Sequence, residues 1–167
     1  KGVLTKRFIK FLDEKAKKES ESYNKDFWPD FGMFIREGAC SDFVHKEAIA
    51  KLLRFNSSTM DKDSLTSLDD YVSRAKAAQN NIYFISGSNY DQAMQSPYMD
   101  IFKRNNLEVL ILTNPIDEFV MQSIQNYNSR KLKSAESDDL DLDGASLESE
   151  KERDSKARSK KGGLTDK

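Results

Sequence analysis

Hydrophobic residues recur at helical spacing through the first third of the chain. In residues 3–19 they lie three or four positions apart, with lysines on the other face, which predicts an amphipathic helix whose buried stripe is Leu4, Phe8, Phe11 and Leu12. Residues 21–37 repeat this spacing, and their apolar positions are Tyr23, Phe27, Phe31, Phe34 and Ile35.

Proline and glycine divide this helical region. We expect Pro29 to kink or restart the second helix near Trp28, because proline lacks an amide donor and crowds the preceding turn. Gly38 is the expected end of that helix. A third helix is predicted from Asp42, as its N-cap, to Arg54.

The next helix carries its own start signal. Ser67 with Asp70, or Thr66 with Asp69, approximates a capping box, in which each side chain bonds a backbone amide of the first turn. The buried stripe that this helix predicts consists of Leu68, Tyr71, Val72 and Ala75.

Strand periodicity follows. The runs 82–85 and 109–112 are apolar at every position, which is typical of strands covered on both faces. Helical sequence broken at Pro97 separates them, so we predict a right-handed βαβ unit with parallel strands.

A last helix begins at "NPIDEF". Asn114 should cap it, Pro115 suits its first position, and Asp117 and Glu118 meet the positive end of the helix dipole. Its predicted buried face consists of Ile116, Phe119, Val120 and Ile124.

These elements predict an α/β fold class with three parts. Residues 1–64 form a small helical coil or three-helix bundle, and residues 65–133 form a small α-β-α sandwich with a βαβ unit. Residues 134–167 have few large apolar side chains and carry an acidic block followed by a mixed-charge one, so we expect a disordered linker or tail.

Composition narrows the classes of function. The chain has 33% charged and 37% hydrophobic residues and a formal net charge of −1, which argues against a dedicated nucleic-acid or membrane-surface protein. Its single cysteine excludes an internal disulfide. The N-terminus lacks a secretory cleavage site and begins inside a helical pattern, so we expect a longer parent protein.

No group of residues predicts an active site. The turn at 87–89 follows a strand, where α/β sheets bind ligands, but it lacks a phosphate-binding motif and is better explained as a turn. His45 is the only histidine and Cys40 has no paired base, so neither predicts catalysis. Asp117 and Glu118 are explained by their place in a first helical turn.

One segment matches a calcium-loop pattern. In "DLDLDGASLESE" (139–150) the ligand and turn positions are occupied by Asp139, Asp141, Asp143, Gly144 and Glu150. The flanking segments lack the apolar stripes of clamping helices, and Ser146 replaces the usual hydrophobic residue. A calcium-binding regulatory module is therefore an alternative, as is a free-standing α/β ligand-binding domain that uses Gly87.

Several segments resemble the heat shock protein 90 chaperone family. They are FWPDFGMFIREG (27–38), IAKLLRFNSS (49–58), LTSLDDYVSRAKAAQNNIYFISG (65–87), SPYMDIFKRNNLEVLILTNPIDEF (96–119) and YNSRKL (127–132). Their order and spacing follow the family over residues 1–133. Pro29 departs from it, because relatives generally run a helix through that position. The matching part is the latter portion of the family's middle segment.

The resemblance implies one part of an ATP-driven, dimeric clamp that folds client proteins. The ATP-binding domain and the loop with the catalytic arginine would precede Lys1, and the dimerisation domain would follow residue 167. We therefore expect no catalytic residue, cofactor or metal here, whereas ATP and magnesium are implied for the parent homodimer. This part would link the arms of the clamp.

Clients and co-chaperones are the implied partners. For client contacts we single out Trp28 and Phe34, and for an acidic co-chaperone the basic side chains of Lys6, Arg7 and Lys10; the alternative is that the aromatic residues are core and the lysines are a solvated face. The acidic tail resembles plastid-type members and "MFIREG" resembles mitochondrial-type ones. An organelle is the expected location, with the cytoplasm or endoplasmic reticulum as alternatives.

Overall fold

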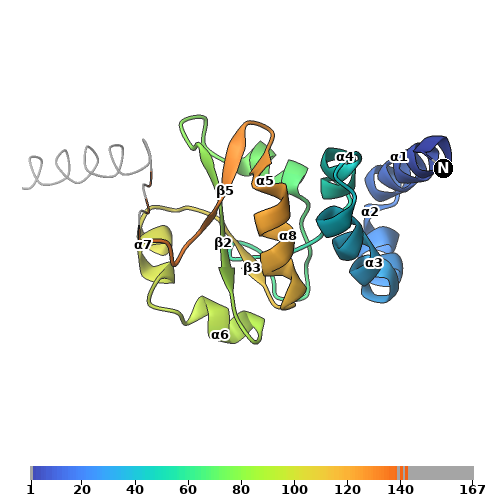
Figure 1. The fold of residues 1–167 in the computed structure, drawn as a ribbon. Helices are drawn as coiled ribbons and strands as arrows, with labels where there is room; N and C mark the ends of the chain where they lie inside the picture. The colour runs from blue at the N-terminus through green and yellow to red at the C-terminus, as the bar shows by residue number, and fades with distance from the viewer. Residues whose placement is uncertain (1, 139, 141, 143–167) are drawn as a thin grey trace, which may run out of the picture.

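The computed structural model describes residues 2–138, 140 and 142 (Figure 1). A group of helices at the N-terminal end lies to one side of a twisted sheet, which has helices on both faces. The N-terminal group consists of α1 (Gly2–Lys18), α2 (Ser20–Ser22), the π-helix η1 (Tyr23–Phe27), α3 (Trp28–Ser41) and α4 (Lys46–Ala50). The remaining helices are α5 (Leu68–Arg74), α6 (Tyr90–Met94), α7 (Met99–Arg104) and α8 (Ile116–Ile124).

The second helical segment is interrupted before Pro29, as the sequence predicts. Residues 23–27 form the π-helix η1, which ends with the amide of Trp28 donating to the carbonyl of Tyr23. Pro29 then lies in the first turn of α3. Because proline offers no amide proton and its ring crowds the carbonyl four residues earlier, a wider turn at this point relieves the clash.

Two helix boundaries differ from the prediction. α3 continues past Gly38, which has no positive φ and stays inside the helix. Asp42 does not start a long helix, because its carboxylate accepts the amides of Val44 and His45 at 3.1 and 3.0 Å and closes a separate turn. α4 begins after this turn and is only five residues long.

The sheet has five strands in the order β1-β3-β2-β5-β4. The strands are β1 (Asn56–Ser57), β2 (Asn81–Ser86), β3 (Val109–Leu112), β4 (Asn126–Tyr127) and β5 (Arg130–Ser134). β2 is parallel to β3 and β5, and the edge strands β1 and β4 pair antiparallel. The chain passes from β2 to β3 through α6 and α7, so the predicted parallel βαβ unit and the α/β fold class are confirmed.

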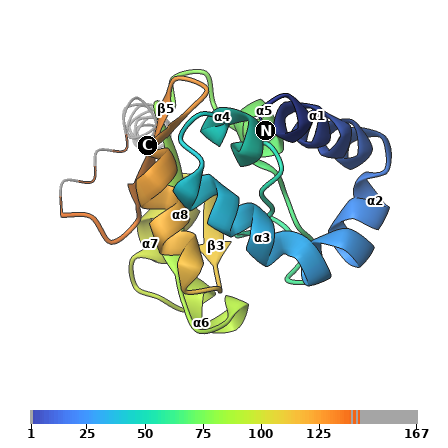
Figure 2. The same cartoon turned by 45° about the vertical axis from the view of Figure 1, so that its right-hand side comes forward.

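Alternate residues of the central strands face two apolar cores. Ile82 and Leu110 face a core shared with α5, α8 and the N-terminal helices. Tyr83 and Ile85 face a second core shared with α6 and α7. Figure 2 shows α3 lying against α8, so the first core joins the helical part directly to the sandwich.

The start of the predicted tail belongs to the sandwich. Ser134 ends β5, and Ala135 and Leu142 are buried in the second core at 2% and 6% exposure, so the prediction of disorder is wrong for these residues. Their apolar side chains complete the face that α6 and α7 cover. The rest of the predicted tail, residues 139, 141 and 143–167, lies outside the described residues. Within the described chain, none of the helices has the length and apolar character of a membrane span.

Candidate functional site

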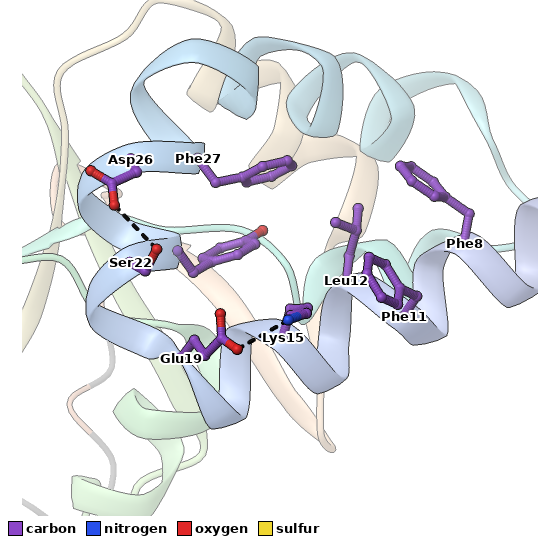
Figure 3. A pocket seen from close by; sticks show the side chains of 9 residues that line it. Phe8, Phe11, Leu12, Lys15, Glu19, Ser22, Asp26 and Phe27 are labelled. Atoms are coloured by element: carbon purple, nitrogen blue, oxygen red, sulfur yellow. Dashed lines mark hydrogen bonds and ion pairs between the residues drawn. The ribbon is translucent and has the colours of Figure 1, made fainter.

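An apolar groove opens between α1 and the segment formed by α2 and η1 (Figure 3). We call it the aromatic groove; it is lined by Phe8, Phe11, Leu12, Lys15, Glu19, Ser22, Tyr23, Asp26 and Phe27. Its volume is about 450 Å³, within the range of pockets that hold small ligands or side chains. In Figure 3 the side chain of Phe27 points from η1 toward Phe8 on α1.

Phe8, Phe11 and Leu12 in the α1 wall of the groove belong to the stripe that the sequence placed in the core, together with Leu4, which lies outside the groove. Leu4, Phe8 and Phe11 are 75%, 58% and 53% exposed, so of the predicted stripe only Leu12 is buried. The row of α1 that faces the core consists of Ile9, Leu12 and Ala16. The two rows lie side by side on α1. The helix is oriented so that Ile9, Leu12 and Ala16 face the other helices.

Tyr23 and Phe27 in the η1 wall belong to a ladder of stacked aromatic rings that continues to Phe31 on α3. The ring centroids of Tyr23 and Phe27 are 5.0 Å apart, and those of Phe27 and Phe31 are 5.1 Å apart, with interplanar angles of 26° and 28°. Exposure increases along the ladder from 4% at Tyr23 to 48% at Phe31. The Tyr23 hydroxyl donates to the carbonyl of Leu52 at 2.7 Å, which anchors the ladder in the first core.

Polar groups at the rim of the groove satisfy one another. Lys15 pairs with Glu19 at 3.0 Å and lies 6.0 Å from the centroid of the Phe11 ring. Ser22 donates to the Asp26 carboxylate at 3.1 Å. An apolar floor with a polar rim can take apolar side chains while the backbone of the bound segment stays in water.

The residues singled out for partner contacts differ in exposure. Trp28 is only 5% exposed, so the expectation that it is exposed is wrong and the core interpretation holds. The indole belongs to the first core, and the guanidinium of Arg36 lies 4.7 Å from its ring. The indole also packs closely on Gly32, where a Cβ would approach it to 2.9 Å. Phe34 is 67% exposed, as expected.

The basic residues Lys6, Arg7 and Lys10 are all exposed on α1. Lys6 and Lys10 also line a smaller apolar depression between α1 and α4, together with Ile9. Whether these side chains bind a co-chaperone stays a prediction.

On α8 the sequence missed an exposed aromatic residue. Phe119 is 63% exposed, whereas its predicted place was the buried face. Asp117 is buried instead, because its carboxylate accepts from the Nε of Arg36 on α3 at 2.7 Å. Burial raises the pKa of Asp117, although the guanidinium of Arg36 acts in the opposite direction. Local sequence signals could not predict this ion pair, because Asp117 lies on α8 and Arg36 lies on α3.

Phe119 borders a second, more polar crevice at the carboxyl ends of β2 and β3. Its volume is about 790 Å³, and Gly87 and Glu118 also line it. The reason for glycine at position 87 is packing, because a Cβ there would lie 2.8 Å from the Cβ of Ala93. Packing against Ala93 therefore explains the glycine in this turn, and no bound ligand is needed to explain it.

The remaining candidates, His45 and Cys40, lie in surroundings that have a structural explanation. His45 contacts the carboxylate of Asp42 through Nδ1 at 2.9 Å, which fixes the turn between α3 and α4. Burial raises the pKa of the Cys40 thiol and so disfavours a reactive thiolate. The described residues include no group of three side chains that could hold a metal ion. The calcium-loop ligands Asp139, Asp141, Asp143 and Glu150 lie outside the described residues, as do Gly144 and Ser146.

Comparison with known proteins identifies the family. The family model described as Hsp90 protein matches residues 1–167. Chaperone protein HtpG of Desulfitobacterium hafniense is 45% identical over 149 residues, which cover 87% of this chain and 24% of that relative. Chaperone protein HtpG of Methylococcus capsulatus is 39% identical over 154 residues, which cover 92% of this chain and 24% of the relative. The chain therefore spans about a quarter of the length of these relatives. With the family model matching from end to end, the chain belongs to the Hsp90 protein family.

Proposed function

We propose that this chain is the latter part of the middle segment of an ATP-dependent chaperone, and that the aromatic groove binds apolar segments of client proteins. The observation that carries the proposal is the groove itself: exposed Phe8 and Phe11 face Phe27 across a space of about 450 Å³ in a member of a chaperone family. Exposed apolar surface of this kind commonly marks an interaction site. Phe34 and Phe119 are further exposed aromatic side chains outside the groove that are available to a client.

Different parts of the parent protein would have different roles. The sandwich and the helical coil would link the arms of the clamp, while ATP and magnesium would be bound by other parts of a parent homodimer. On this view the chain alone has no ATPase activity, which an assay of released phosphate tests. Co-chaperone binding at Lys6, Arg7 and Lys10 is a second proposed contact. An organellar location stays a prediction.

Substitution of the two exposed phenylalanines tests the groove. Serine at Phe8 and Phe11 removes apolar contact area where little is buried, so folding should change little and binding should weaken. The matched control is Tyr98→Ser, since Tyr98 is 51% exposed but lies before α7, in the part of the chain that covers the other face of the sheet.

Binding is measured by fluorescence anisotropy with a labelled peptide that contains leucine and phenylalanine and has no stable structure. We expect the double variant Phe8→Ser/Phe11→Ser to bind at least about tenfold more weakly, as expected for loss of 1.4 kcal/mol or more. Tyr98→Ser should bind as the unchanged protein does. Equal affinity in the double variant, with its circular dichroism unchanged, would reject the groove as the client site.

A further inference from the structure

The π-helical wall of the groove is held at both ends by an arginine stacked on an aromatic ring. At its start, the guanidinium carbon of Arg54 lies 4.6 Å from the ring centroid of Tyr23. Immediately after its end, that of Arg36 lies 4.7 Å from the ring of Trp28. Tyr23 is the first residue of η1 and Trp28 is the residue that caps it. The two stacks therefore bracket the segment that carries Phe27 into the groove.

Arg54 makes its bonds to neutral groups. It is 6% exposed, and its Nε donates to the side-chain oxygen of Asn24 in η1 at 2.9 Å. Its Nη1 donates to the carbonyls of Lys51 and Leu53 at 3.0 and 2.9 Å. Among the described residues, no carboxylate lies within ion-pair distance of this guanidinium. Arg54 thus joins η1 to the turn that follows α4.

Arg36 joins the other end of η1 to the sandwich. Its Nε donates to the Asp117 carboxylate at 2.7 Å, and the side chains of the pair are 14% and 3% exposed. Ser123, further along α8, donates to the carbonyl of Ala39 on α3 at 3.0 Å. The α3 end of the groove wall is therefore fixed to α8.

Stability alone does not explain these arginines. Burying a cation carries a desolvation penalty, and apolar residues of similar volume are often equally stable at such positions. A planar guanidinium, in contrast, fixes the orientation of the ring on which it stacks and of the groups to which it donates. We propose that Arg54 and Arg36 are positioning residues, which hold η1 at the distance and rotation from α1 that keep the aromatic groove open. This inference rests on the proposed function of the groove.

The test substitutes Arg54, because its removal leaves no buried carboxylate unpaired. Arg54→Met keeps the length of the side chain and removes the planar cation. Arg104→Met controls for the loss of a positive charge alone, since Arg104 is exposed on α7, away from the groove. Spin labels at Glu14→Cys on α1 and Asp30→Cys on α3, with Cys40→Ser, report the distance across the groove by pulsed electron resonance. Affinity for the labelled peptide is measured by fluorescence anisotropy, as for the groove variants. The temperature is one at which circular dichroism shows that each variant is fully folded.

We expect Arg54→Met to broaden the distance distribution and to weaken peptide binding by roughly tenfold, a size typical of coupling between neighbouring sites. Arg104→Met should change neither. If Arg54→Met does not fold, Arg54→Lys, which keeps the charge but loses the planar stack, should give the same broadening.

If the folded Arg54 variant has the same distance distribution as the original protein, the positioning role is rejected. This holds even where the original protein binds the peptide and so confirms the proposed function. If instead the unchanged protein binds no peptide but the distribution broadens in the variant, the client site is rejected and the positioning of η1 stands.

Discussion

At the scale of single residues, the glycines of this chain serve different purposes. A Cβ on Gly87 would lie 2.8 Å from the Cβ and 3.1 Å from the amide nitrogen of Ala93, so β2 can meet α6 only with glycine there. A Cβ on Gly38 would lie 3.5 Å from the Cδ1 of Ile49, which is an ordinary contact. No close contact requires glycine at position 38, and Gly38 lowers the helical propensity of α3.

We expect alanine to have opposite effects at these two positions. Gly87→Ala should lower the free energy of unfolding by about 1–3 kcal/mol, because backbone atoms of α6 must move. Gly38→Ala should raise it by up to about 1 kcal/mol. Urea denaturation followed by circular dichroism measures both. A Gly87→Ala protein of unchanged stability would contradict the packing explanation and revive the ligand-binding alternative for this turn.

At the scale of elements, local signals predicted the start of α5 correctly and that of α8 to within one residue. The amide of Asp70 donates to the Ser67 hydroxyl at 3.1 Å, so of the two start signals in the sequence the first is used. Asn114 accepts the amide of Ile116 at 3.2 Å, but α8 begins one residue later than predicted, with Pro115 rather than Asn114 as its N-cap. These bonds form between residues close in the chain, and the sequence therefore contains all that is needed to predict them.

Loss of the α5 cap should have a measurable cost. Ser67→Ala leaves the amide of Asp70 without its side-chain acceptor, so we expect the free energy of unfolding to fall by about 0.5–2 kcal/mol. Ser73→Ala, an exposed position of the same helix, serves as the control and should change it by less than about 0.5 kcal/mol. Thermal unfolding of both variants measures the difference. An equal effect of the two would show that the cap contributes no more than the exposed Ser73 hydroxyl, which donates to the carbonyl of Asp70 at 2.7 Å.

The elements that sequence analysis missed depend on distant partners. Helical spacing showed that α1 and α8 are amphipathic, but it placed Phe8 and Phe119 in the core because the choice between adjacent faces is made by the neighbouring helices. β5 has the sequence "RKLKS" and is mostly half-buried, so its alternation of apolar and polar residues is weak. Its strand conformation depends on pairing with β2. The groove escaped prediction for the same reason, since its two walls come from separate elements.

At the scale of the whole molecule, buried tyrosine hydroxyls join elements that are distant in the chain. Tyr23 on η1 donates to Leu52, and Tyr71 on α5 donates to the carbonyl of Glu108 at 2.7 Å. Burial raises the pKa of Tyr23 to about 12 and also raises the pKa of Tyr71. Burial and a hydrogen bond to Asp69 raise the pKa of Tyr127. The native protein thus keeps these phenols protonated at pH values where an unfolded chain, with a tyrosine pKa near 10, has lost the protons.

This difference predicts alkaline unfolding. Because the folded state binds these protons more tightly, the contribution of Tyr23 to stability is complete below pH 10 and is lost as the pH rises through about 12. Urea denaturation at a series of pH values from 8 to 12 should show a fall in the free energy of unfolding that begins near pH 10.

Tyr23→Phe separates this effect from general alkaline damage. The variant loses the hydrogen bond to Leu52 and should be less stable by about 1 kcal/mol at neutral pH. It also has no phenol to ionise at this position, so its stability should fall less steeply between pH 10 and 12 than that of the unchanged protein. Parallel curves for the two proteins over that range would mean that Tyr23 does not drive the transition. A shallower curve for the variant would show that ionisation of Tyr23 contributes to the loss of stability in alkali.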